Sequence, residues 1–172
     1  SVNGLFAGNF EPSKETIYAI YPSSAVLLSS GKVVASIPAE QSYSSARGAD
    51  LKEKVLLVGS AKESTDFILS PAAAVLLFDI TLPAEREIWT VTVESEKVGI
   101  AGKGSIELGS GIIRDLEAKS LVLNYESHPK GKSADGWATI AAVDLNSAGG
   151  KVTFAVQTDE GVYTFCTTPE KF

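Results

Sequence analysis

The side chains with the clearest capacity for chemistry occur singly: His128 is the only histidine and Cys166 the only cysteine. A lone histidine excludes a multi-histidine zinc or iron site within this chain. A lone cysteine excludes an intramolecular disulfide and a multi-cysteine metal site. His128 could serve a Ser-His-Asp triad, because serine is abundant, but it precedes Pro129 in a polar stretch, and a general base needs rigid placement. We therefore expect His128 to be a solvated loop residue.

The remaining candidates for a nucleophile or a general acid or base are expected to have structural roles. Cys166 alternates with neighbours near the end of an apparent strand, with no cation nearby to activate a thiolate. We expect it to be a small buried hydrophobe. Two acidic pairs, Glu85 with Glu87 and Glu94 with Glu96, are spaced so that each pair shares one face of a strand. A glycosidase would need such carboxylates in a cleft, and the solvated face of a sheet is the simpler expectation.

Two glycine-containing stretches resemble ligand-binding loops only superficially. "GIAGKGSIELGSG" (99–111) has neither phosphate-binding spacing and does not begin a helix, so we expect a β-hairpin with a tight turn at Gly102-Lys103-Gly104. "DLNSAGG" (144–150) lacks the later ligands and the closing glutamate of a calcium loop, so a hairpin loop is expected there. No catalytic, cofactor-binding or metal-binding residue is assigned, no cofactor is expected, and the chain is expected not to be an enzyme.

The two tryptophans could together form a platform on which a sugar stacks. Trp89 shares one face of an alternating segment with Val91 and Val93, so it is predicted to lie in the core. Trp137 follows the polar stretch 126–137, the longest in the chain and the one expected to be most flexible, and its role stays open.

Composition indicates a folded globular protein. The 172 residues are 44% hydrophobic and 21% charged, with a net charge of −6, and the basic residues are scattered. Nucleic-acid binding is therefore not expected, because phosphate contacts need clustered Lys and Arg. No apolar run approaches the ~20 residues of a membrane helix. The chain has no methionine, so we expect a processed or trimmed product that has lost any targeting signal.

Period-two alternation of β-branched and aromatic residues dominates the sequence. Turn residues separate nearly all of the alternating segments. The predicted strands are 17–21, 24–28, 32–37, 54–60, 66–69, 73–81, 87–94, 97–101, 103–108, 119–125, 136–144, 152–158 and 161–167. Helical spacing occurs only in 111–121, where one or two turns are the most that the pattern supports. We predict an all-β fold with little or no helix, an antiparallel β-sandwich in a single domain spanning 1–172.

The alternation also predicts the core and one turn. Alternating apolar positions must face a shared interior. "TDEGVY" between the last two strands is expected to be a short hairpin with Gly161 at positive φ. The predicted inward-facing residues are Ile20, Leu76, Phe78, Trp89, Val91, Phe154 and Val156.

One phrase with fixed spacing resembles a known family. Tyr18-Ala19-Ile20-Tyr21-Pro22 is followed by a strand over Val33–Ile37, then by Pro38 and Gln41. Each proline ends a strand because it cannot donate to a ladder. This phrase and the order of the later strands resemble the fimbrillin-like family, the pilins and surface adhesins of type V pili, over nearly the whole chain.

The resemblance implies a transthyretin-like, Greek-key sandwich and a non-enzymatic cell-surface structural protein of a Gram-negative bacterium. Family members are made as lipoprotein precursors at the outer membrane and assemble into a fimbrium by strand exchange between subunits, so the implied partners are other pilus subunits or surface ligands in cell adhesion. Relative to the family pattern, this chain is expected to be the amino-terminal module, truncated at both ends. The alternative is a carbohydrate- or protein-binding module of a surface lipoprotein, using 126–137 with Trp137; its ligand-binding residues are unknown.

Overall fold

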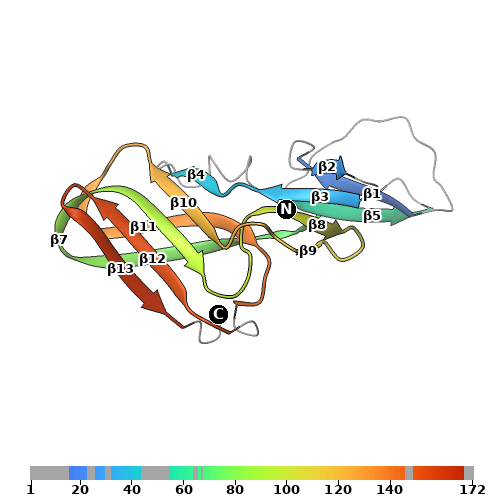
Figure 1. The fold of residues 1–172 in the computed structure, drawn as a ribbon. Coiled ribbons are helices and arrows are strands. Elements are labelled where there is room, and N and C mark those ends of the chain that lie inside the picture. The colour runs from blue at the N-terminus through green and yellow to red at the C-terminus, as the bar shows by residue number, and fades with distance from the viewer. Residues whose placement is uncertain are drawn as a thin grey trace.

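The computed structural model describes residues 16–22, 26–29, 32–43, 55–63, 66, 68–145 and 149–168, and it confirms the all-β prediction. Strands β10 to β13 gather at one end of the molecule, and the shorter strands β1, β2, β3, β5, β8 and β9 at the other (Figure 1). The strands are β1 Thr16–Tyr21, β2 Val26–Ser29, β3 Lys32–Ile37, β4 Glu40–Tyr43, β5 Leu57–Lys62, β6 Ser70–Pro71, β7 Ala73–Ser95, β8 Gly102–Glu107, β9 Ile112–Arg114, β10 Ser120–Tyr125, β11 Lys130–Ala141, β12 Val152–Thr158 and β13 Gly161–Thr167.

The strands form three sheets. The largest sheet has the strand order β13-β12-β7-β10-β4, and β11 pairs with a separate part of β7. The other two sheets have the orders β1-β5-β6 and β2-β3-β8-β9. All pairs are antiparallel except one, because β4 runs parallel to β10. The predicted antiparallel sandwich is thus confirmed, with one parallel pair at the edge where a strand from early in the chain joins one from much later.

Strand β7 unites the two predicted strands 73–81 and 87–94 and serves two layers. Its 23 residues turn back at one end of the molecule (Figure 1). The amino-terminal half pairs with β11, and the carboxy-terminal half pairs with β12 and β10. Pro83 lies in an irregularity where residues 82–85 oppose Lys132 alone. Because proline cannot donate to a ladder, this break in pairing is where a bent strand tolerates it.

A second irregularity overturns the prediction that Trp89 is core. Thr158 of β12 pairs with Ile88, and the next residue back, Gln157, pairs with Thr90, so Trp89 has no partner on β12. One extra residue shifts the side-chain alternation by one position. Buried positions are even-numbered up to Ile88 and odd-numbered from Val91 onward, and Trp89 is left only half-buried.

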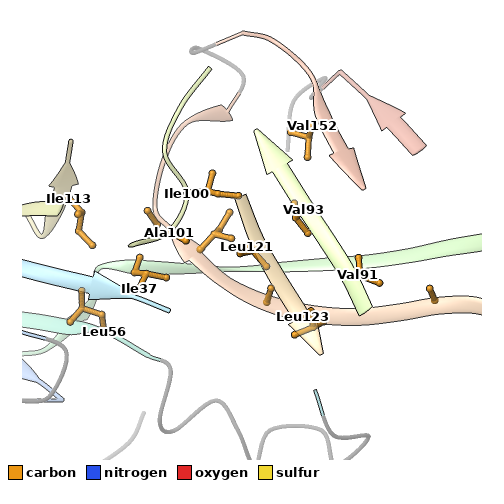
Figure 2. Packing of buried hydrophobic residues seen from close by; sticks show 14 of the residues in the cluster. Ile37, Leu56, Val91, Val93, Ile100, Ala101, Ile113, Leu121, Leu123 and Val152 are labelled. Carbon is orange, nitrogen blue, oxygen red and sulfur yellow. The ribbon is translucent and has the colours of Figure 1, made fainter. Parts of the chain in front are cut away.

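The core runs continuously from the short sheets into the large one. Figure 2 shows Ile37 of β3 and Ile113 of β9 in the same cluster as Leu121 of β10 and Val152 of β12. The prediction was right for Val91 and Val156, which are fully buried. The other predicted core residues apart from Trp89 are half-buried against the cluster: Ile20, Leu76, Phe78 and Phe154.

Two predictions between 97 and 108 were wrong. Residues 97–101 form only a single bridge, Ala101 with Ala118, and the expected turn at Gly102-Lys103-Gly104 lies inside β8. The hairpin turn instead joins β8 to β9 after Glu107. A Cβ on Gly104 would lie 2.6 Å from the Arg114 carbonyl oxygen, so this glycine serves close strand approach and not a turn. Residues 111–121 contain β9 and no helical turn, in agreement with the prediction of little or no helix.

The polar stretch 126–137 is mostly strand, not a flexible loop. Strand β11 begins at Lys130, and only residues 126–129 connect it to β10. The polar residues Ser133 and Asp135 are exposed while Ala134 and Gly136 are buried. Burial therefore alternates along this part of β11 as in other strands, but the buried residues are small. The predicted strand 66–69 is likewise displaced, to the two residues of β6; residue 67 lies outside the described part.

The hairpin at the end of the chain was predicted correctly. Asp159 and Glu160 form a two-residue turn between β12 and β13, and Gly161 has a φ of 135°. Residues with a side chain rarely adopt this φ, which explains glycine there.

Candidate functional site

The principal candidate site is an incompletely covered face of the large sheet. In the second layer, β11 packs over β10, since a Cβ on Gly136 would lie 3.1 Å from the Tyr125 hydroxyl and 3.2 Å from Leu123. Beside it, the first half of β7 packs over β12, with the Phe78 and Phe154 rings 5.7 Å apart. No described strand continues this layer over β13. Two layers must normally cover each other to bury a sandwich core, so this side of the sheet has no cover from the strands that the structure describes.

Strand β13 shows the consequence of the missing cover. Its inward-facing residues Tyr163 and Phe165 are only half-buried, and both pack against the margin of the core. The Tyr163 hydroxyl accepts a hydrogen bond from Arg86 Nε at 3.0 Å, and Arg86 also pairs with Glu160 at 2.8 Å. The hydrogen bond to Tyr163 is the first cause, ahead of the nearby carboxylates, of a raised pKa for Arg86. These contacts hold the β12–β13 hairpin to the bend of β7 and leave its aromatic face uncovered.

The edge of the first half of β7 is open on this same side. In β11, the Thr139 amide and carbonyl and the Ala141 amide all bond to groups other than β7. The backbone groups of odd-numbered residues of β11 therefore point away from β7. In an antiparallel pair, the backbone groups of their partners on β7 must then point away from β11. Val75, Leu77 and Asp79 consequently direct their amides and carbonyls to an edge with which no described strand pairs.

Large apolar side chains accompany this edge. Leu77 is 73% exposed and Val75 is 47% exposed, although both lie opposite buried residues of β11. Natural edges are usually protected by charge, proline or a bulge, and here only Asp79 provides such protection. We name the free edge of Ala73–Thr81, together with the uncovered faces of Tyr163 and Phe165, the open edge.

The opposite edge of β11 is closed by side chains. Gln41 donates from Nε2 to the Thr139 carbonyl at 2.7 Å, and its Oε1 accepts from the Thr139 amide at 2.9 Å. The Tyr125 hydroxyl donates to the Asp135 carbonyl at 2.6 Å, and the Ala141 amide donates to the Ile100 carbonyl. Gln41, three residues after Pro38, thus acts as a side-chain substitute for a neighbouring strand.

A second candidate is a cleft of about 250 Å³ between the end of β4, the 126–129 turn and the start of β11. Its floor is Ile88 and Tyr125, both nearly fully buried. Tyr43 lies edge-on to Tyr125, with the ring centroids 5.1 Å apart. Ser127, Lys130, Ser133 and Asp135 supply polar groups around the cleft. Tyr43 and Tyr125 were not predicted as site residues, although Tyr125 alternates in phase with the buried Leu121 and Leu123.

Tyr125 gives this region a testable dependence on pH. Burial, followed by the Asp135 carboxylate and Tyr43, raises the pKa of Tyr125 above its ordinary value of 10.0. Above pH 10 the unfolded chain loses the phenol proton while the folded chain keeps it, so stability must fall as pH rises, until the folded pKa is reached. We expect up to about 1.4 kcal/mol less stability per pH unit in this window, and Tyr125→Phe to remove that slope. Urea unfolding from pH ~8 to ~11 measures it; parallel slopes for parent and variant would contradict the assignment.

His128 was predicted to be a solvated loop residue, and the structure confirms this. It lies in the 126–129 turn with a φ of 42°, and its side chain is 54% exposed. Its Nδ1 lies 3.5 Å from Glu87 Oε1, and the same oxygen accepts from Trp89 Nε1 at 3.2 Å. The His128 and Trp89 rings are 6.3 Å apart. The contacts of His128 are thus with Glu87 and Trp89, and neither supplies the nucleophile of a triad.

The other candidate residues are dispersed. Trp137 is 6% exposed and packs near Tyr43, so it cannot form an open stacking platform with Trp89. Cys166 was predicted to be buried but is exposed, because it lies on the outer face of edge strand β13 with its sulfur 3.5 Å from Thr153 Oγ1. Glu85, Glu94 and Glu96 are exposed, as expected for a solvated face, and Glu87 is half-exposed.

In the stretch 144–150, compared above with a calcium loop, the described residues form no set of metal ligands. Residues 146–148 fall outside the described part. Within the ranges that the structure describes, no group of three His, Cys, Asp or Glu side chains could hold a metal ion. The Glu96 carboxylate instead accepts the Lys151 amide at 3.0 Å, and this bond, followed by Lys97, lowers the pKa of Glu96.

Among the described residues, none belongs to a helix with the length and apolar character needed to cross a membrane. Comparisons of this chain with protein-family models, with curated proteins and with solved structures give no match.

Proposed function

We propose that this chain is a non-enzymatic structural protein of a bacterial cell surface, a fimbrillin-like pilus subunit or adhesin that assembles by accepting a strand from a neighbouring subunit. The observation that carries this proposal is the open edge. It combines unpaired backbone groups on Val75, Leu77 and Asp79 with half-buried aromatic residues on the facing sheet. Main-chain hydrogen bonds would give an added strand its affinity, and alternate side-chain contacts would give it its register.

The geometry supports one mode of addition. A strand beside the first half of β7 would extend the second layer over β13, where its inward side chains would meet Tyr163 and Phe165. Its backbone would pair with the odd-numbered residues of β7, whose groups point that way. The transthyretin-like topology, the Gram-negative surface location and the lipoprotein precursor belong to this proposal through the fimbrillin-like resemblance alone.

The test uses a synthetic peptide with alternating apolar residues, designed to pair as a strand with the free edge of Ala73–Thr81. We expect it to bind and, at a hundredfold excess over Kd, to stabilise the protein by about 2.7 kcal/mol. For a chain of this size that corresponds to roughly 5–10 °C in Tm. Leu77→Pro removes an amide that points into the open edge without removing a bond to β11, so it should abolish binding.

Leu77→Thr is the matched control, because it removes the same exposed leucine but keeps the amide, and it should bind the peptide nearly as well as the parent. Circular dichroism must show that Leu77→Pro remains folded. A peptide that neither binds the parent nor raises its Tm would refute the proposal, as would binding that survives Leu77→Pro.

A further inference from the structure

The cleft beside Tyr43 has the chemistry of a binding site, independent of the open edge. It is lined at its base by apolar and aromatic surface from Ile88 and Tyr125. The half-buried Tyr43 forms one side, fixed by edge-on contacts with Tyr125 and Trp137. Ligand sites typically combine such apolar walls with a few convergent polar groups.

The polar groups of the cleft are available to a ligand. Within the described part of the chain, neither the Lys130 ammonium nor the Asp135 carboxylate forms a hydrogen bond or an ion pair, and the Ser127 hydroxyl forms no hydrogen bond. Both charged residues are exposed. Together they offer a carboxylate that accepts two or more hydrogen bonds, an ammonium that donates up to three, and a hydroxyl that does both.

The cleft is also held rigidly. The Tyr125 hydroxyl binds the Asp135 backbone carbonyl, and the Ile88 amide binds the Pro129 carbonyl at 3.0 Å. Ser133 donates to the Asp79 carboxylate across the β11–β7 pair. These bonds tie the 126–129 turn and the start of β11 to β10 and β7, so the polar groups are positioned before a ligand arrives.

From this arrangement we infer that the cleft binds one neutral sugar residue. One positive and one negative side chain lining the same cleft favour a neutral ligand with several hydroxyl groups over an ion. The half-buried Tyr43 ring, held in place by the buried Tyr125, supplies the apolar contact that the carbon face of a pyranose needs. At about 250 Å³ the cleft is smaller than the usual pocket of a drug-sized molecule, which limits the ligand to a single ring.

Nuclear magnetic resonance with a panel of methyl pyranosides, covering glucose, galactose, mannose and N-acetylglucosamine, tests this inference. We expect at least one of them to shift the amide signals of residues 127–135 saturably, with a Kd on the order of 1 mM. Asp135→Asn leaves the backbone bond to Tyr125 in place and should weaken binding about tenfold. Glu94→Gln, which removes an exposed charge on β7 outside the cleft, should leave binding unchanged.

Three outcomes would overturn the inference. They are the absence of saturable shifts in 127–135 for every pyranoside, equal weakening by Asp135→Asn and Glu94→Gln, and preferential binding of methylguanidinium, which would assign the carboxylate to a cationic peptide side chain. None of these depends on the peptide titration at the open edge, so either proposal can fail alone.

Discussion

Replacing Trp137 by alanine is expected to lower the free energy of unfolding by about 3–5 kcal/mol. Trp137 is 6% exposed on β11 and packs edge-on against Tyr43, so truncation removes a large buried surface and leaves a cavity. The surrounding strands cannot easily collapse into it, because β11 is held on one side by β7 and on the other by Gln41. Equilibrium urea unfolding followed by circular dichroism measures the loss.

Trp89→Ala is the matched control. Trp89 is half-buried, lies outside the core cluster and contacts mainly Glu87 and His128, so its truncation should cost about 1 kcal/mol. Fluorescence of the two variants provides a second check, since the variant that retains only Trp137 should emit at shorter wavelength. Equal destabilisation by the two substitutions, or a larger effect of Trp89→Ala, would contradict the assignment of Trp137 to the core.

The incorrect assignment of Trp89 to the core shows why part of the fold was predictable and part was not. Alternation predicted the strand class, the positions of most strands and the burial of Val91 and Val156, because these depend only on a side-chain period of two. The bulge at Trp89 adds one residue with no local sequence signal. Strict alternation, applied across it, therefore placed Trp89 on the wrong face.

The first half of strand β11, before the predicted strand 136–144, was missed for a different reason. Its first residues are Lys, Gly, Lys and Ser, which favour a loop by composition, and its inward positions Ala134 and Gly136 carry almost no apolar surface. Small residues are needed there because β11 approaches Tyr125 and Leu123 closely. That requirement comes from another strand, so it could not be read locally.

The candidate sites were likewise predictable only in part from the sequence. The proline-bounded phrase indicated that Gln41 is special, while its partner Thr139 lies 98 residues away and could not be inferred. The open edge depends on which strands fail to pair, and the cleft depends on Tyr43 of β4 running parallel to β10. Both are properties of long-range pairing, which periodicity does not specify.

Gln41→Leu is expected to destabilise the protein by about 2–5 kcal/mol, although leucine is apolar and similar in size. Gln41 is 3% exposed, and its amide satisfies the buried amide and carbonyl of Thr139 as well as the Pro38 carbonyl at 3.0 Å. Leucine leaves the buried amide and the buried carbonyl of Thr139 without partners, and each such group costs about 1–3 kcal/mol. Urea unfolding gives the free energy, and hydrogen exchange at Thr139 gives the local effect.

Gln41→Glu separates hydrogen bonding from packing, because it keeps the shape and the acceptor oxygen but lacks the Nε2 donor. At neutral pH the buried carboxylate would face the Thr139 and Pro38 carbonyls, so this variant should be at least as unstable as Gln41→Leu. Lowering the pH should recover part of the loss, because a protonated carboxyl can donate again to one carbonyl. If Gln41→Leu keeps parental stability and slow exchange at Thr139, Gln41 does not close this edge, and the structural reason for the spacing of Pro38 and Gln41 fails with it.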